Sequence, residues 1–281
     1  MIKNIDLRLV PPILISLILA TAHLSFGVLQ WWGTIATAIG VAVLTELILG
    51  RLYWGSWPHP ASGYTSGISV GILVRSTGGI LWPFALTSAL SIASKYVLRV
   101  KDRHLWNPSN FGLCAIFLLA PYAVAPLNMQ WGNNLWPMLM IWVVGIYVIW
   151  KVKRFHITGT YIVAFVVLAF VRSFITGHTF AAEVAPLTGP MYQLFALFMI
   201  TDPVTTVSSK RGEMVVTVII AVVELFLRLG EVVYAPFYAL FIVGPLAMLA
   251  EMWWNGELFA PAEADSAETE SAETTVTQPA T

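Results

Sequence analysis

Landmarks in the first half of this chain return in the second half after a nearly constant distance of 125 to 128 residues. Apolar segments, a hydroxyl–Gly pair and an aromatic–X–Pro motif each occur twice, starting at Val10 and Leu135, Trp31 and Ile157, Ser62 and Thr188, and Trp106 and Tyr234. Each half holds five apolar segments. Because five is odd, the second half must enter a membrane from the opposite face. The pattern predicts an inverted repeat with a site near the midplane between the halves.

The composition is typical of a membrane protein. Hydrophobic residues make up 58% of the chain and charged residues 11%, whereas soluble domains contain roughly 25% charged residues. The net charge is zero, so the chain lacks the basic excess of a nucleic-acid-binding protein. We therefore expect an all-α polytopic protein whose main surroundings are the lipid bilayer, with no nucleic-acid partner.

Ten apolar segments predict about ten transmembrane helices. They cover about residues 9–26, 30–50, 62–75, 79–98, 108–125, 135–151, 157–175, 188–201, 212–229 and 233–252. We expect residues 1–128 to form the first five-helix repeat, 129–255 the second, and 256–281 a disordered acidic tail. The third and eighth segments correspond in the repeat and are shorter than the roughly 20 residues of a full span. Such pairs indicate a binding or transport site, unless they are tilted spans without a ligand.

Basic residues predict the orientation. With the N-terminus inside, twelve of the 15 Lys and Arg residues fall on the inner side, and only Arg75, Arg172 and Arg228 lie toward the outer side. Positive charge favours the cytoplasmic face. We therefore expect a multi-pass protein of the cell inner (plasma) membrane with both termini in the cytoplasm.

Two charged residues fall at corresponding positions within the apolar segments. Glu46 lies in the second segment and Arg172 lies 126 residues later, in the seventh. The two either form an ion pair across the halves, which would neutralise a costly buried charge, or extend separately to the membrane surfaces. Glu224 and Arg228 are four residues apart, which favours a local pair on one helix.

Polar clusters mark three expected helix breaks. The first contains Thr65 and Ser66, the second Asn107 before Pro108, and the third Asp202, Thr205 and Thr206. Pro203 disfavours helix at Asp202, and the hydroxyls that follow can cap the next helix. Alternatively, broken helix ends present donors to a polar or anionic ligand. We predict that these six residues line a polar cavity that binds a cofactor.

The same motifs resemble the RnfD/NqrB family, the membrane subunits of Rnf and Na⁺-translocating NADH:quinone oxidoreductase complexes, and the smaller UnbU proteins. Residues 198–212 read Phe-Met-Ile-Thr-Asp-Pro-Val-Thr-Thr-Val-Ser-Ser-Lys-Arg-Gly, which is similar to the family's Thr-Asp-Pro-Val run. Residues 106–112, Trp-Asn-Pro-Ser-Asn-Phe-Gly, are similar to its Phe-Asn-Pro motif. The resemblance implies a ten-span electron-transport subunit with redox partner subunits, a flavin or quinone, and coupling to ion transport.

The chain departs from this family at the outer loop before the sixth segment. Members carry FMN through a phosphoester bond on a threonine there, but residues 126–134 contain neither Thr nor Ser. We therefore expect no covalent flavin in this loop. The resemblance then implies a non-covalent flavin, either FMN or riboflavin, or electron relay from a neighbouring subunit.

Three functions remain open from the sequence. The chain is a membrane electron-transport subunit, which could belong to a membrane oxidoreductase complex, or a channel or transporter without redox function, or a scaffold subunit that anchors soluble partners. The sequence leaves open whether it is an enzyme. His and Cys residues show no spacing typical of a metal site, so we expect no metal.

Overall fold

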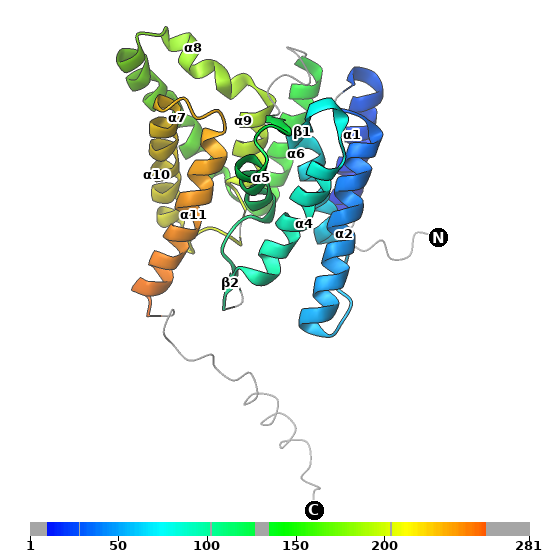
Figure 1. Cartoon of the computed structure of the whole chain (residues 1–281). Coiled ribbons are helices and arrows are strands. Elements are labelled where there is room, and N and C mark those ends of the chain that lie inside the picture. The colour runs from blue at the N-terminus through cyan, green and yellow to red at the C-terminus, as the bar shows by residue number, and fades with distance from the viewer. Residues whose placement is uncertain (1–9, 28, 102, 127–134, 203, 257–281) are drawn as a thin grey trace, which may run out of the picture.

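The computed structural model describes residues 10–27, 29–101, 103–126, 135–202 and 204–256. This part of the chain is all-α, with eleven helices and two short β-ladders (Figure 1). The helices are α1 (Val10–Phe26), α2 (Trp32–Trp54), α3 (Ala61–Leu73), α4 (Trp82–Val97), α5 (Pro108–Leu119), α6 (Leu135–Val152), α7 (Phe155–Thr176), α8 (Phe180–Val184), α9 (Pro190–Leu194), α10 (Lys210–Leu229) and α11 (Ala235–Trp254). Single turns form η1 (Thr77–Gly79), η2 (Ala185–Thr188) and η3 (Phe195–Met199), and the strands are β1 (Val74–Ser76), β2 (Arg99–Val100), β3 (Arg103–His104) and β4 (Val124–Pro126).

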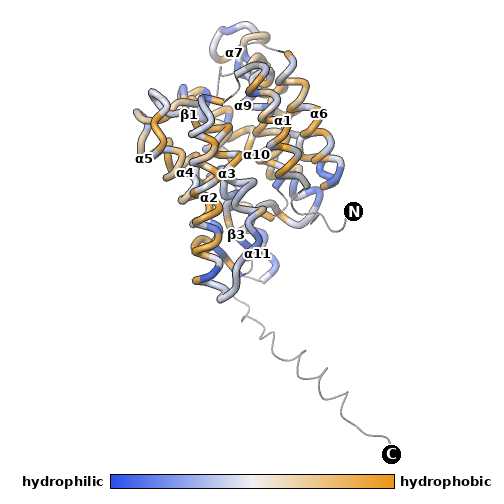
Figure 2. Tube along the Cα trace, turned by 90° about the vertical axis from the view of Figure 1, so that its right-hand side faces the viewer, coloured by the Kyte–Doolittle hydropathy of each residue, from blue (hydrophilic) through white to orange (hydrophobic). Residues whose placement is uncertain are grey.

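Every apolar segment predicted from the sequence contains a helix, the eighth being α9 together with η3. Three helices, α2, α7 and α11, are long and apolar enough to cross a membrane, which indicates a membrane protein. The expectation of about ten spans is confirmed only to this extent. Apolar residues predominate along the helices in Figure 2. The short α8 and η2 were not predicted, because they lie in a stretch without a clear apolar period.

The third and fifth segments end as helices earlier than predicted. α3 stops at Leu73 and α5 at Leu119, so they contain 13 and 12 residues. The residues that follow form β1 and β4, which pair antiparallel. Pro121 disfavours helical geometry at Ala120, whose φ of −141° is extended, and this ends α5. At about 1.5 Å per residue, neither helix spans a 30 Å hydrocarbon layer by itself.

The predicted break at Thr65 and Ser66 is wrong, because both residues lie within the continuous helix α3. The Thr65 hydroxyl donates to the Ala61 carbonyl oxygen within this helix (2.9 Å). The glycines around them serve close packing instead. A Cβ on Gly67 would lie 2.6 Å from Ile39 Cα of α2, and one on Gly63 would lie 3.0 Å from the Ala42 carbonyl oxygen. Small residues four apart thus bring α3 and α2 into backbone contact, as in many membrane helix pairs.

The other two predicted helix boundaries are confirmed. Asn107 caps α5, its side-chain oxygen accepting from the Asn110 backbone N–H (3.1 Å). Ser209 caps α10 in the same way, accepting from the Gly212 N–H (3.0 Å). The last turn before Asp202 is the π-helical η3, in which the Ile200 N–H donates to the Phe195 carbonyl oxygen (3.1 Å).

The two halves repeat one packing pattern. In the first half α4 packs against both α2 and α5, and in the second half α10 packs against both α7 and α11. Figure 1 shows α1 and α2 on one side of the molecule and α7, α10 and α11 on the other, with α5 and α9 between them. One apolar core joins the halves, where Phe117 of α5 stacks on Tyr234 with ring centroids 3.8 Å apart.

Residues 103–110 make the polar contacts that join the halves. Pro245 lies inside α11 and cannot donate to the Phe241 carbonyl oxygen, so this acceptor lacks its helical partner. The Trp106 indole N–H donates to that oxygen instead (2.8 Å). The Asn110 amide donates to the Phe237 carbonyl oxygen one turn earlier (3.3 Å). Side chains from the first half therefore satisfy the backbone of α11.

Three expectations concern residues outside the described part of the chain. They are the boundary between the repeats near residue 128, the absence of covalent flavin from the loop up to residue 134, and the disorder of the tail beyond Gly256. All three stay predictions.

We predict that Gly67→Ala destabilises the protein by about 1–3 kcal/mol, because its methyl group would force α3 away from the α2 backbone. The matched control is Gly40→Ala in α2, where an added Cβ meets no atom within 4 Å. Alanine favours helix there by about 1 kcal/mol, so this variant should gain stability. Thermal unfolding in detergent measures both. Equal effects of the two substitutions would contradict the packing of α3 on α2.

Candidate functional site

A cavity of about 530 Å³ lies between the two halves of the chain. α1, α3, α5 and the α4–α5 connection form its wall from the first half, while α6, α9, η3 and the segment after η3 form it from the second half. The third and eighth apolar segments, both short, therefore face the same cavity. Its size falls within the range of roughly 300–1,000 Å³ that is typical of small-molecule sites.

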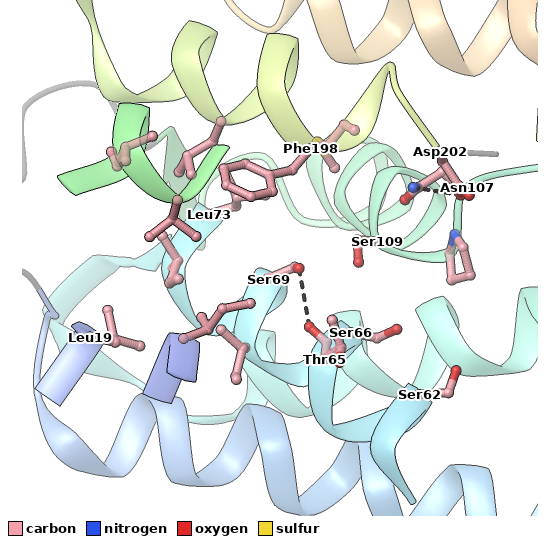
Figure 3. Close-up of a pocket in the computed structure, with 18 of the residues that line it drawn as sticks. Leu19, Ser62, Thr65, Ser66, Ser69, Leu73, Asn107, Ser109, Phe198 and Asp202 are labelled. Carbon is pink, nitrogen blue, oxygen red and sulfur yellow. Dashed lines mark hydrogen bonds between the residues drawn. The ribbon is translucent and has the colours of Figure 1, made fainter. Parts of the chain in front are cut away.

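The cavity is apolar at one end and polar at the other (Figure 3). The apolar end is lined by α1, α6 and the second-half residues Leu194, Phe198 and Met199. The polar residues come mainly from the first half, and they are Ser62, Thr65, Ser66, Ser69, Lys95, His104, Asn107, Ser109 and Asp202. Such a site suits a ligand with an apolar body and one polar edge.

Four of the six predicted site residues meet in this cavity. Thr65 and Ser66 project from α3, and Asn107 and Asp202 lie at the opposite wall. The Asn107 amide donates to Asp202 Oδ2 (2.9 Å), and the Val204 backbone N–H donates to Asp202 Oδ1 (3.1 Å). Both carboxylate oxygens are thus held by the protein. Asp202 therefore holds the polar end of the cavity in place, and the hydroxyl groups remain available to a ligand.

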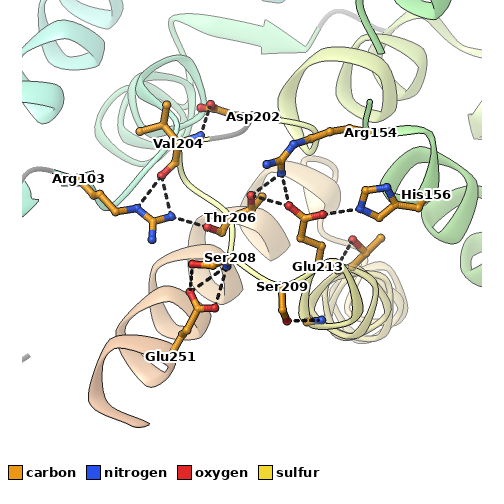
Figure 4. A network of polar contacts seen from close by, with 12 residues as sticks. Arg103, Arg154, His156, Asp202, Val204, Thr206, Ser208, Ser209, Glu213 and Glu251 are labelled. Atoms are coloured by element: carbon orange, nitrogen blue, oxygen red, sulfur yellow. Dashed lines mark hydrogen bonds and ion pairs between the residues drawn. The ribbon is translucent and has the colours of Figure 1, made fainter. Parts of the chain in front are cut away.

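Thr205 and Thr206 do not line this cavity. Thr205 is buried in a narrow cleft between α10 and α11. Thr206 belongs to a polar network at the start of α10, shown in Figure 4. Its hydroxyl accepts from Arg154 (2.7 Å), and its carbonyl oxygen accepts from Arg103 (2.5 Å). The structure therefore gives Thr206 a role in holding the segment between η3 and α10.

Among the cavity residues that the sequence argument missed, Lys95 and His104 carry ionisable side chains. The Lys95 ammonium donates to Glu46 Oε1 (2.5 Å) and to the Ser62 hydroxyl (2.8 Å). The sequence analysis counted Lys95 only as one of the basic residues expected on the inner side, and His104 only as one of five scattered histidines. Only the packing of α4 on α2 reveals that Lys95 reaches a buried carboxylate.

His104 lies in β3, outside the apolar segments, at the cavity wall, where its surroundings favour the neutral imidazole. Burial lowers its pKa below the usual 6.5, against the raising effect of Asp202, and the positive charges of Lys95, Arg99 and Arg103 lower it further. A neutral imidazole has one donor and one acceptor nitrogen. His104 therefore offers either kind of hydrogen bond to a ligand.

The expected ion pair between Glu46 and Arg172 is wrong. Glu46 is almost fully buried and pairs with Lys95, and the Tyr96 hydroxyl also donates to Glu46 Oε1 (3.0 Å). Arg172 pairs with Glu183 of α8. Each of the two charged residues therefore pairs with a residue of its own half.

Glu183 lies at the centre of a charge cluster that joins α7, α8 and the end of α10. Arg172 and Arg228 both pair with its carboxylate, and Thr176 and His178 donate to it. The expected local pair between Glu224 and Arg228 is replaced by this cluster. Instead, the buried Glu224 carboxylate accepts from the Tyr161 hydroxyl (2.6 Å).

The groups in the cavity do not include a metal site. Within the described residues, three or more His, Cys, Asp or Glu side chains nowhere gather as metal ligands. Comparisons with known protein families and with curated protein sequences find no match to this chain.

We predict that Glu183→Gln destabilises the protein at neutral pH by about 3 kcal/mol, since two partly buried arginines would lose the anion that they share. Burial alone would raise the pKa of Glu183, but hydrogen bonds from His178, Arg172 and Thr176 lower it below 4.5. Its stabilisation is therefore complete above the unfolded-state pKa of about 4.5 and is lost as the pH falls through the lower folded-state value.

Unfolding measured from pH 7 to pH 3 tests this prediction. The difference between the parent protein and Glu183→Gln should shrink below about pH 4. Glu231→Gln is the control, because Glu231 is exposed and forms no ion pair with the described residues. A constant difference at every pH would show that packing, not charge, explains the effect.

Proposed function

We propose that this protein is a membrane electron-transport subunit that binds a flavin or quinone non-covalently in the cavity between its halves. The observation that carries the proposal is the cavity itself, with apolar walls, one polar end and walls from both short segments. A flavin or quinone ring is flat and apolar, with carbonyl oxygens along one edge. When bound, it supplies one- and two-electron transfer.

The donors at the polar end fit such a ring edge. A lysine ammonium has three N–H donors, and Lys95 uses two of them on Glu46 and Ser62. The hydroxyls of Ser66 and Ser109 make no hydrogen bond within the described residues and remain available. Lys95 and these hydroxyls would hold the carbonyl edge, while Phe198 and neighbouring aliphatic side chains would cover the ring faces.

Contacts between loops support the proposed ten-segment topology, in which successive loops alternate between two sides, and the Lys and Arg bias supports a cytoplasmic location for both termini. Loops predicted on the inner side contact one another, as in the bonds from Arg103 to Thr206, Arg154 to Thr206 and Ser208 to Glu251. Loops predicted on the outer side do the same, as in the bond from Gln30 to Ser76 (2.7 Å). The repeated packing of α2, α4 and α5 by α7, α10 and α11 supports the inverted repeat.

The partner subunits follow from the same proposal. An electron-transport subunit needs a donor and an acceptor, and the resemblance to the RnfD/NqrB family supports redox subunits of an inner-membrane complex. The inner face, with most of the basic residues, is the surface that we propose for a soluble partner. Coupling to ion transport would then depend on the complex rather than on this chain alone.

A transporter without redox function is the second candidate, and η3 favours it. A short helix that ends in a π-helical turn beside a cavity is a feature of many transport sites. A transporter would bind its solute in the same cavity but would carry no chromophore. The measurement below therefore separates the two functions.

We predict that the protein purified in mild detergent retains a flavin, seen by absorbance and released by denaturation, or a quinone found by extraction. Ser66→Trp should reduce the retained ligand at least tenfold, because the indole fills the polar end of the cavity. Ala36→Trp is the control, since Ala36 is exposed on α2. Absence of both ligands from protein purified with its native partners would contradict the redox function, and solute flux would then support the transporter.

We predict that the loop around residues 127–134 faces the outside. The only cysteine, Cys114, is buried, so Cys114→Ala gives a suitable background. Asn133→Cys should react with an impermeant maleimide added to intact cells, whereas Lys153→Cys should react only after the cells are opened. The reverse pattern would invert the topology, and labelling of both from one side would contradict the repeat.

A further inference from the structure

A second pocket, of about 510 Å³, lies where α6 ends and both α7 and α10 begin. Its lining residues are Trp150, Lys151, Lys153, Phe155, His156 and Lys210. The bond between Arg154 and Thr206 places it among the loops at the inner end. His156 connects the pocket to the polar network of Figure 4, in which His156 and Arg154 both pair with Glu213.

The pocket carries positive charge without a compensating anion. Lys151, Lys153 and Lys210 are exposed, and none of them pairs with a carboxylate of the described residues. The nearby Glu213 is buried and already engages Arg154 and His156. Three ammonium groups that line one pocket attract an anion such as a phosphate group.

An apolar groove of about 630 Å³ adjoins this pocket. His156 lines both spaces. The groove runs between α7 and α10, and apart from His156 and Thr160 its lining is glycine and apolar side chains, namely Gly159, Val163, Ala164, Val167, Leu168, Met214, Val218 and Val222. A Cβ added to Gly159 would meet no atom within 4 Å, so the groove is open there.

We propose that the pocket and groove together bind one anionic phospholipid of the inner leaflet. The phosphate of the lipid meets the three lysines, and one acyl chain lies along the groove between α7 and α10. Trp150 and Phe155 are 66% and 50% exposed at the helix ends, which suits aromatic side chains at the depth of the lipid headgroups. Basic pockets between helices on the cytoplasmic side bind anionic headgroups in the same way. The lipid site is separate from the cavity between the halves, so this proposal does not depend on the function of that cavity.

Retention of lipids by the full chain, measured by native mass spectrometry, tests the proposal. Phosphatidylglycerol should bind in preference to phosphatidylcholine. Lys153→Gln with Lys210→Gln should weaken phosphatidylglycerol binding about 30-fold, because each lysine contributes about a factor of five at an anionic surface. The control is Arg51→Gln with Lys101→Gln, which removes the same charge elsewhere on the inner side, and Lys101 shares the positive φ of Lys153. Equal losses from the two double variants would overturn a specific site.

A separate substitution tests the groove. Gly159→Phe should weaken phosphatidylglycerol binding at least tenfold by filling the acyl-chain path, while Gly40→Phe, at another open glycine, should not. Unchanged binding in Gly159→Phe would overturn the proposed path.

Two competitors distinguish other occupants of the pocket. If sn-glycerol 3-phosphate displaces phosphatidylglycerol at similar concentrations, the site takes a free anion and the lipid proposal is wrong. The six acidic residues of the tail from Glu257 to Glu273 are the other competitor. If their replacement by amides raises lipid binding more than tenfold, the tail is the occupant and the proposal is overturned. No change in either experiment supports the lipid.

Discussion

The unsatisfied carbonyl oxygen of Phe241 explains how the halves of this protein are joined. Pro245 removes its helical donor, and a bare acceptor is costly where water is scarce. Trp106 supplies the donor, and this fixes the start of α5 against α11. Asn107, the next residue, is thereby placed where its amide meets Asp202. The hydrogen bond that replaces the missing donor in α11 thus also positions the polar end of the cavity.

α3 turns this frame into a binding site because its two faces differ. Its glycines pack into the backbone of α2, and on the opposite face Ser62, Thr65, Ser66 and Ser69 recur at helical spacing toward the cavity. The corresponding segment of the second half contributes Leu194 and Phe198 instead. The proposed repeat therefore has symmetric helices and an asymmetric site, with hydroxyls from one half and apolar side chains from the other. A ligand with one polar edge fits in one orientation only.

The sequence predicted the helices, two of their caps and four residues of the cavity. These features depend on local patterns, such as apolar runs and the Asn107–Pro108 pair. The partner of Glu46 could not be predicted, because Lys95 lies 49 residues away and meets it only through the rotation of α4 on α2. The glycines of α3 were read as a break, since glycine both interrupts helices and permits close packing. Tertiary packing decides between these two roles of glycine, and the local sequence does not specify that packing.

The distribution of charged residues explains why a ligand in the cavity would help to hold the two halves together. The buried carboxylates find their partners within one half, Glu46 with Lys95 and Glu183 with Arg172 and Arg228, so no ion pair of the described residues joins the halves around the apolar end. The polar bonds between the halves, as far as the structure describes them, come from residues 103–110. Apolar packing alone therefore joins α1 and α3 to α6 and η3. A ligand that fills the cavity adds contacts to both walls, and because it binds only the assembled halves, it stabilises them by mass action.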